Sequence, residues 1–165
     1  MTAGTLGDVP DTEGAVDIDV EALSRQGRGI IASGWIANVV FAVTAIPVAA
    51  GVDDLLGVAI GVALVLFLIS VFVFVYAFAL ALARSSRGDN VAVANLFFLQ
   101  GSAPKPIKRT FLWMSLVCLA ITVGTVAWEP FGVLVPMLPV GLAGMWAARY
   151  GVFPPRPAGQ PRRRV

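Results

Sequence analysis

The chain has 165 residues, of which 58% are hydrophobic and 13% are charged, and its formal net charge is +2. This composition excludes a water-soluble domain, because a fold of this length could not cover so much apolar surface. One cysteine and no histidine also exclude an internal disulfide framework, a cysteine-based metal cluster and histidine acid–base chemistry.

Residues 1–29 are predicted to form a disordered acidic tail. The first 21 residues carry six carboxylates and no Lys or Arg, which is typical of a segment without a packed core. No cleavable signal peptide is expected, because this tail is polar and acidic and the apolar run after it is too long for an h-region.

Four long apolar runs predict an all-α integral membrane protein. They cover residues 30–50, 55–83, 111–128 and 131–148, and they contain no Asp, Glu, Lys or Arg. At about 1.5 Å per residue, roughly 20 helical residues cross a hydrocarbon core about 30 Å thick. The runs have 21, 29, 18 and 18 residues, so each approaches or exceeds the length of a span. Their continuity argues against the alternating strands of a barrel.

The fourth run contains Pro136 and Pro139, which leaves a buried soluble helix as an alternative for this segment. Membrane helices tolerate such prolines, with a kink, when neighbouring groups satisfy the freed carbonyls. We therefore keep this run as the fourth span of a transmembrane domain that covers residues 30–150.

The distribution of cations predicts the orientation. All twelve Lys and Arg residues lie in the N-terminal tail, in the 84–110 loop or after residue 148, whereas the 51–54 and 129–130 connections carry only acids. Because cations are retained on the inner side of a membrane, we expect two antiparallel hairpins with both termini and the 84–110 loop in the cytoplasm. Ten Arg against two Lys in an Ala- and Val-rich chain favour a bacterial genome rich in G and C, and hence a bacterial inner membrane.

The short connections and the aromatic residues fit this arrangement. Gly51 is expected to end the first helix in a left-handed conformation, Asp53 or Asp54 to cap the second, and Pro130 to start the fourth. The aromatic residues expected at headgroup depth are Trp35, Trp113, Trp146 and Tyr150 at the inner boundary and Trp128 at the outer one.

The 84–110 loop is long for a connection in a small domain and is predicted to contain a short helix over 91–100. Its apolar residues Leu96, Phe97, Phe98 and Leu99 are followed by the cations Lys105, Lys108 and Arg109. This pattern predicts an interfacial helix on anionic lipids of the inner leaflet. Packing under the bundle and docking of a cytoplasmic partner are the alternatives.

Residues 151–165 are predicted to form a basic, Pro- and Arg-rich cytoplasmic tail. Its cluster of Arg162, Arg163 and Arg164 would suit a polyanion such as nucleic acid. Beside a membrane, however, a determinant of topology or a contact with anionic lipid explains these cations more simply, and we expect no nucleic-acid partner.

Small residues mark faces on which helices can approach closely in lipid. Gly57 and Gly61 form a GxxxG motif in the second run, and Gly141, Gly144 and Ala148 form a similar face in the fourth. Such motifs serve packing within a chain as well as self-association, so a homo-oligomer is left open.

The predicted spans contain few polar residues that could bind a ligand or take part in a reaction. Asn38 is the polar residue that is costliest to leave unpaired, and it is expected to bond a neighbouring helix or to line a cavity. Asp53, Asp54 and Glu129 are interpreted as helix caps and solvated charge at the outer mouth, with a shared cation as the alternative. No catalytic, cofactor-binding or metal-binding residue is predicted, because no motif of a known catalytic type is present.

Several classes of small membrane protein are excluded on specific residues. A small multidrug exporter would carry a Glu inside its first span, a vitamin K epoxide reductase-like enzyme a CxxC pair, and a CDP-alcohol phosphotransferase clustered Asp residues in a helix. None of these features occurs in the sequence. Two function classes remain: a non-catalytic assembly partner of other membrane components, or a small-solute channel or permease acting as an oligomer.

Overall fold

The computed structural model describes residues 27–89 and 91–153, and these residues form helices and turns without a strand. The elements are α2 (Arg28–Ala49), the 3-10 turn η1 (Asp53–Leu55), α3 (Leu56–Ser86), α4 (Val93–Phe97), α5 (Lys105–Thr125), the 3-10 turn η2 (Pro130–Leu134) and α6 (Met137–Tyr150). The prediction of an all-helical fold is confirmed for this part of the chain. The predicted acidic tail and the Arg162–Arg164 cluster lie outside the described residues.

Four segments are long and apolar enough to cross a membrane, which indicates a membrane protein. They are Arg28–Ala49, Asp53–Ser86, Lys105–Thr125 and Pro130–Tyr150. The third starts six residues before the predicted run at 111, because a helix can begin with polar residues. Pro104 and Pro106 lie at its N-cap and first turn, where the missing N–H groups would have no helical partner anyway.

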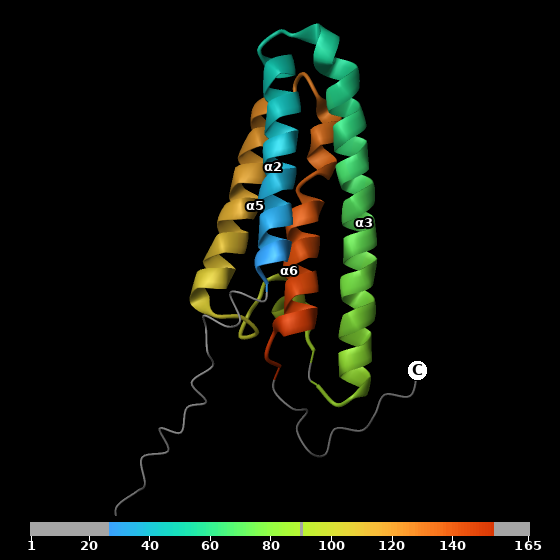
Figure 1. The fold of residues 1–165 in the computed structure, drawn as a ribbon, viewed down its shortest axis with the longest axis vertical. Coiled ribbons are helices and arrows are strands. Elements are labelled where there is room, and N and C mark those ends of the chain that lie inside the picture. The colour runs from blue at the N-terminus through green and yellow to red at the C-terminus, as the bar shows by residue number, and fades with distance from the viewer. Residues whose placement is uncertain (1–26, 90, 154–165) are drawn as a thin grey trace, which may run out of the picture.

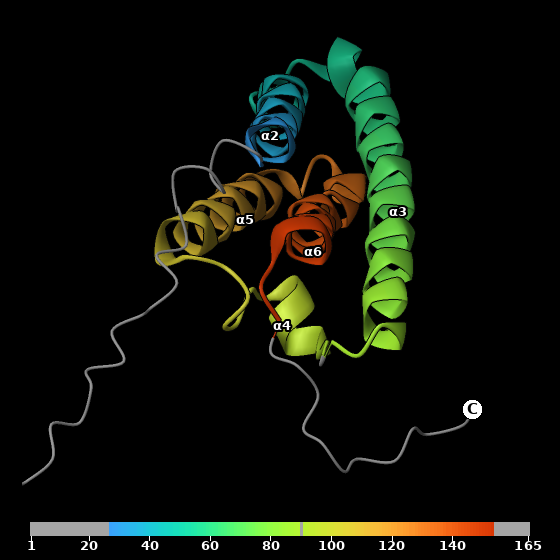
Figure 2. The same cartoon turned by 60° about the horizontal axis from the view of Figure 1, so that its bottom comes forward.

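The four long segments lie side by side, and α6 occupies the middle (Figure 1). Figure 2 shows α6 between α5 and α3, with α2 and α4 on its remaining sides. Accordingly, 61% of the most apolar stretch of the last span is buried, compared with 22–28% in the other three spans. The core therefore surrounds α6, and α2, α3 and α5 each turn a broad apolar face outward.

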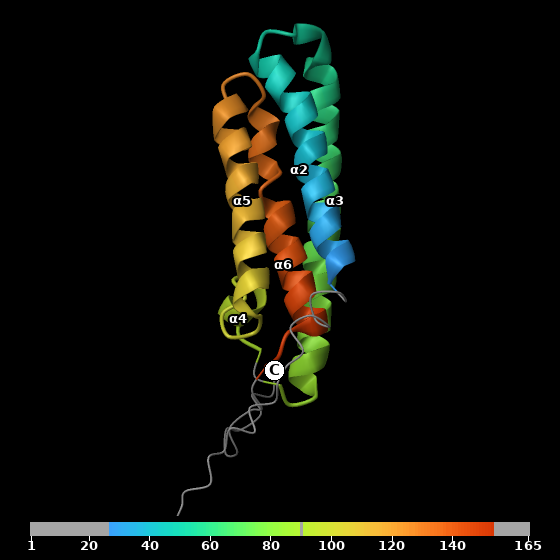
Figure 3. The ribbon, with the colours of Figure 1, turned by 60° about the vertical axis from the view of Figure 1, so that its left-hand side comes forward.

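The turns after α2 and after α5 lie at one end of the molecule, and the 87–104 connection lies at the other (Figures 1 and 3). At the end of α2, Gly51 has a φ of +93°. The N–H of Gly51 donates to the carbonyl of Val48, and that of Val52 donates to the carbonyl of Pro47. This is the Schellman pattern, in which a left-handed glycine closes a helix.

The last span is divided at its prolines, so that α6 begins at Met137 and the 3-10 turn η2 precedes it, where the sequence predicted one kinked helix over 131–148. Pro136 and Pro139 cannot donate to the carbonyls of Gly132 and Val135, four residues earlier. The Val135 carbonyl instead accepts from the N–H of Leu138 at 2.9 Å, and the Gly132 carbonyl accepts from the Thr122 hydroxyl of α5 at 3.3 Å. These two hydrogen bonds satisfy the carbonyls of Val135 and Gly132, so η2 can be followed by α6 without an unpaired carbonyl at these two positions.

The end of α3 is tied to the end of α6 by Arg84. Its Nη1 donates to the carbonyl oxygens of Ala148 at 3.2 Å and Gly151 at 2.9 Å. Its Nε pairs with Asp89 at 2.9 Å, and its guanidinium lies 4.8 Å from the ring centre of Phe153. A cation is favourable here, because the last carbonyls of a helix carry partial negative charge.

The expectation that Trp146 anchors the protein at the membrane boundary is wrong. Its side chain is fully buried, and its indole nitrogen lies directly against Gly27, where an added Cβ would have no room. The reason is the central position of α6, which leaves little of that helix facing outward. Trp35, Trp113 and Trp128, on or beside the outer helices, are exposed.

Candidate functional site

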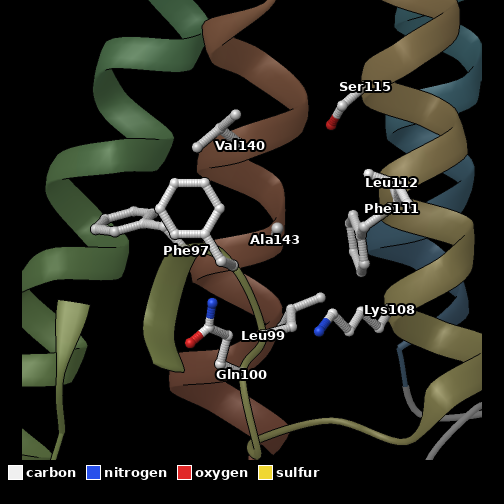
Figure 4. A pocket seen from close by; sticks show the side chains of 10 residues that line it. Phe97, Leu99, Gln100, Lys108, Phe111, Leu112, Ser115, Val140 and Ala143 are labelled. Carbon is white, nitrogen blue, oxygen red and sulfur yellow. The ribbon is translucent and has the colours of Figure 1, made fainter. Parts of the chain in front are cut away.

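A cavity of about 330 Å³ lies toward the end of the molecule that carries the 87–104 connection. Its walls come from α4 with the residues directly after it, from α5 and from α6. Figure 4 shows side chains from all three elements pointing into the same space. The apolar walls include Phe97, Leu99, Phe111, Leu112, Val140 and Ala143. The polar residues among the lining are Gln100, Lys108 and Ser115, so the hollow is apolar with a few polar groups, as ligand pockets usually are.

The predicted interfacial segment forms one wall of this cavity. Leu96, Phe97 and Leu99 are buried, and only Phe98, at 64%, is exposed among the four contiguous apolar residues. The ring of Phe97 stacks on that of Phe74 of α3, with 4.5 Å between centroids. Packing against the long helices, one of the alternatives considered, therefore accounts for three of the four side chains.

The helix in this segment is shorter than the predicted 91–100, because the backbone reverses beyond α4. Leu99 has a φ of +55° and Gly101 a φ of +71°. Glycine adopts this region freely, but a branched residue such as Leu99 is strained there. Leu99 is nevertheless 2% exposed and lines the cavity. Strain of this kind is held in place by packing and occurs preferentially at functional sites.

The three predicted cations at the start of α5 do not share one surface. Lys108 lines the cavity, whereas Lys105 and Arg109 line a separate, open hollow with Trp35 and Trp113. Positions 105, 109 and 113 are four residues apart and so lie on one helix face. Lys108 is exposed, and no described carboxylate forms an ion pair with it.

The small residues on α6 lie at contacts within the chain. A Cβ added to Gly141 would lie 3.4–3.6 Å from Val73, Ser70 and Phe74 of α3, and one added to Gly144 would lie 2.5 Å from the Phe97 ring. Ala148 is buried near the end of the helix. By contrast, Gly57 and Gly61 of α3 have no neighbour within 4 Å of an added Cβ. The two sets of small residues thus occupy different surroundings.

Asn38 is 3% exposed and bonds the neighbouring helix. Its Nδ2 donates to the carbonyl oxygen of Met114 in α5 at 2.9 Å. The contact joins α2 to α5 in the interior, and Asn38 lines neither the cavity beside α4 nor the open hollow formed by Lys105 and Arg109. Of the two expectations for this residue, the hydrogen bond to a neighbouring helix is the one observed.

Glu129 corrects the interpretation of the outer acids as solvated charge. Asp53 and Asp54 are exposed, but Glu129 is 0% exposed. A Cβ on Gly132 would lie 2.5 Å from its Oε2 and 2.8 Å from the Phe41 ring, so the carboxylate packs beside the Gly132 backbone near an aromatic ring. Pro130 follows directly, and the Glu129 backbone, with φ −131° and ψ 85°, lies outside the α region that a following proline disfavours.

The Glu129 carboxyl group has no hydrogen-bond partner of good geometry among the described residues. Burial raises its pKa above the usual range of a glutamate, and the nearby backbone of Gly132 opposes this rise only in part. The surroundings of Glu129 thus stabilise its neutral form relative to its charged form. The burial of Glu129 could not be predicted from the sequence, because the residue lies in a two-residue connection between apolar runs. Pro130, which restricts the Glu129 backbone, was the only local signal.

Among the described residues, no group of three or more His, Cys, Asp or Glu residues is placed to hold a metal ion. The thiol of Cys118 is buried in α5. No protein-family model, curated protein or solved structure matches the chain.

Proposed function

We propose that the protein is a non-catalytic membrane protein that assembles with other membrane components. The GxxxG face of α3 carries this proposal. Gly57 and Gly61 have only open space where a side chain would begin, so this motif serves no packing within the described chain. In lipid, such small-residue faces let a second helix approach closely.

The large apolar surface supports the same proposal. Val58, Leu64, Val65 and Leu68 of α3 are all exposed, and the outward faces of α2 and α5 are similar. Lipid covers such surfaces, and another membrane helix does so equally well. A homo-oligomer and a complex with a different membrane protein both satisfy this requirement.

We place the protein in a bacterial inner membrane, with both termini and the 87–104 connection in the cytoplasm and the four spans as two antiparallel hairpins. The charges support this orientation. The last turns of α3 and α6 and the first turn of α5 carry Arg84, Arg149, Lys105 and Lys108, and these helix ends lie near the 87–104 connection (Figure 1). The turn η1 at the other end carries Asp53 and Asp54. Cations on one side of a membrane mark its cytoplasmic face. In this placement α4 lies at the inner boundary, with Phe98 toward the lipid.

The test is co-purification after crosslinking in native membranes, comparing the natural chain with the Gly57→Leu/Gly61→Leu variant. We expect one stoichiometric partner, or a second copy, to be recovered with the natural chain. The variant should recover about tenfold less of this partner, because a tenfold change in affinity corresponds to a loss of about 1.4 kcal/mol of helix–helix contact energy. Gly124→Leu in α5, another glycine with open space around it, is the matched control and should leave recovery unchanged.

Equal recovery of the partner with the Gly57→Leu/Gly61→Leu variant and with the Gly124→Leu control would contradict the role of this face.

The alternative function, a small-solute channel or permease, predicts flux into liposomes above that of empty controls. The inward position of Asn38 and its bond to Met114 argue against a polar path at this residue. Flux by the natural chain that Asn38→Leu abolishes would favour the channel over the assembly role.

A further inference from the structure

The inner cavity has the layout of a site for an amphiphile. On α5, Lys108, Leu112 and Ser115 all line it, and spacings of three and four residues place them on one helix face. Seven residues of helix separate the first from the last, which is about 10 Å. The cation therefore lies at the end nearest the 87–104 connection, and the apolar wall extends from it along α5 and α6.

The charge of the cavity selects the ligand. Among the described residues that line the cavity, Lys108 alone is charged, and no described carboxylate pairs with its ammonium group. At the surface of a membrane an unpaired lysine attracts anionic lipid, with about 1 kcal/mol per cation. The apolar walls would in turn exclude a fully hydrated anion, so the ligand needs an anionic head and an apolar chain.

The size of the cavity limits what can enter. Its volume of about 330 Å³ lies at the lower end of the range of about 300–1,000 Å³ for small-molecule pockets. A helix about 10 Å wide does not fit into it, but one segment of an acyl chain does. Phe98 and Leu112 are exposed at its edge, so a chain from the surrounding lipid can reach it.

We propose that this cavity binds one anionic phospholipid, with the phosphate on Lys108 and a segment of one acyl chain between α5 and α6. The strained backbone of Leu99, held by packing, shapes the wall opposite α5 (Figure 4). The inference rests on the embedding of α5 and α6 in a membrane. It does not depend on the proposed assembly role, so the two can fail separately.

The experiment reconstitutes the full chain in nanodiscs of phosphatidylcholine with or without phosphatidylglycerol, and native mass spectrometry counts the lipids retained after release. We expect the natural chain to retain one phosphatidylglycerol in preference to phosphatidylcholine. Lys108→Gln should lower that preference about tenfold, as loss of one charge-assisted hydrogen bond would. Arg109→Gln, which removes a neighbouring cation outside the cavity, should leave it unchanged. An equal loss in both variants would mean general surface attraction and would overturn the proposal.

A second pair of variants tests where the acyl chain of the lipid binds. Ser115→Phe places a ring in the cavity, and Figure 4 shows the Ser115 hydroxyl pointing into it. Leu116→Phe adds a ring at an exposed position of the same helix. Ser115→Phe should abolish retention and Leu116→Phe should not, with circular dichroism confirming that both variants fold. Retention by Ser115→Phe equal to that by Leu116→Phe would overturn the site, and preferential retention of added oleate would overturn the assignment to a phospholipid.

Discussion

Replacing Arg84 by Ala should lower the free energy of unfolding by about 2 kcal/mol, because hydrogen bonds made by charged groups contribute about 1.5–3 kcal/mol each and partial exposure reduces that value. The variant loses the bonds to the carbonyls of Ala148 and Gly151 and the pair with Asp89. It therefore releases the end of α3 from the end of α6. Thermal unfolding in detergent micelles measures the loss, and limited proteolysis of the 87–104 connection reports where the structure opens.

Arg87→Ala is the matched control for this prediction. Arg87 is an exposed cation just beyond α3, and no hydrogen bond or ion pair to another described side chain is observed for it. Its replacement should change stability by less than about 0.5 kcal/mol. Arg84→Lys keeps the positive charge but loses the planar guanidinium group, so its loss of unfolding free energy should lie between those of Arg84→Ala and Arg87→Ala. If Arg84→Ala and Arg87→Ala unfold at the same temperature, the bonds at the end of α6 do not stabilise the fold.

The second large effect is the pH dependence of stability caused by Glu129. Burial raises the pKa of this group in the folded chain, so the folded state binds more protons than the unfolded state above the usual glutamate pKa of about 4.3. Stability must then fall as the pH rises, by about 1.4 kcal/mol per pH unit between the unfolded and the folded pKa. Above the folded pKa the penalty is complete and stays constant. We expect Glu129→Gln, which stays neutral, to be the more stable chain at neutral pH and to lack this slope.

Thermal unfolding of both chains in the same detergent, from about pH 4 to about pH 9, tests this expectation. The difference between the two curves isolates Glu129, because the other titrating groups are common to both. Asp53→Asn is the control, since Asp53 is an exposed acid near the same end, and it should leave the slope intact. Parallel curves for the natural chain and Glu129→Gln would show that the carboxyl group titrates as a solvated one.

Arg84 and Glu129 lie near opposite ends of the molecule and differ in how their polar atoms are satisfied. The guanidinium of Arg84 has partners on α6 and in the connection after α3. The carboxyl group of Glu129 has none of good geometry among the described residues. A buried polar group without a partner costs stability. Protonation of Glu129 is the change that would relieve this cost.

Part of the candidate site could be anticipated from the sequence. The run 96–99 beside basic residues indicated a segment that meets the apolar region, and Lys108 was among the cations named. The division of those cations between two hollows could not be anticipated, because it depends on which helices flank α5. The same limit applies to Gly57 and Gly141, which look alike in sequence. Only Gly141 lies close to a neighbouring helix within the chain.

The sequence by itself determined that this protein is helical and apolar enough to cross a membrane four times. Span length and continuous hydrophobicity are properties of a single segment, and lipid leaves the backbone few alternatives to a helix. Only the tertiary structure decided that α6 lies in the middle, that Trp146 and Glu129 are buried, and that Leu96, Phe97 and Leu99 pack inward. In chains that are apolar on every side, hydrophobicity does not mark the inner face of a helix, so contacts between distant segments decide it.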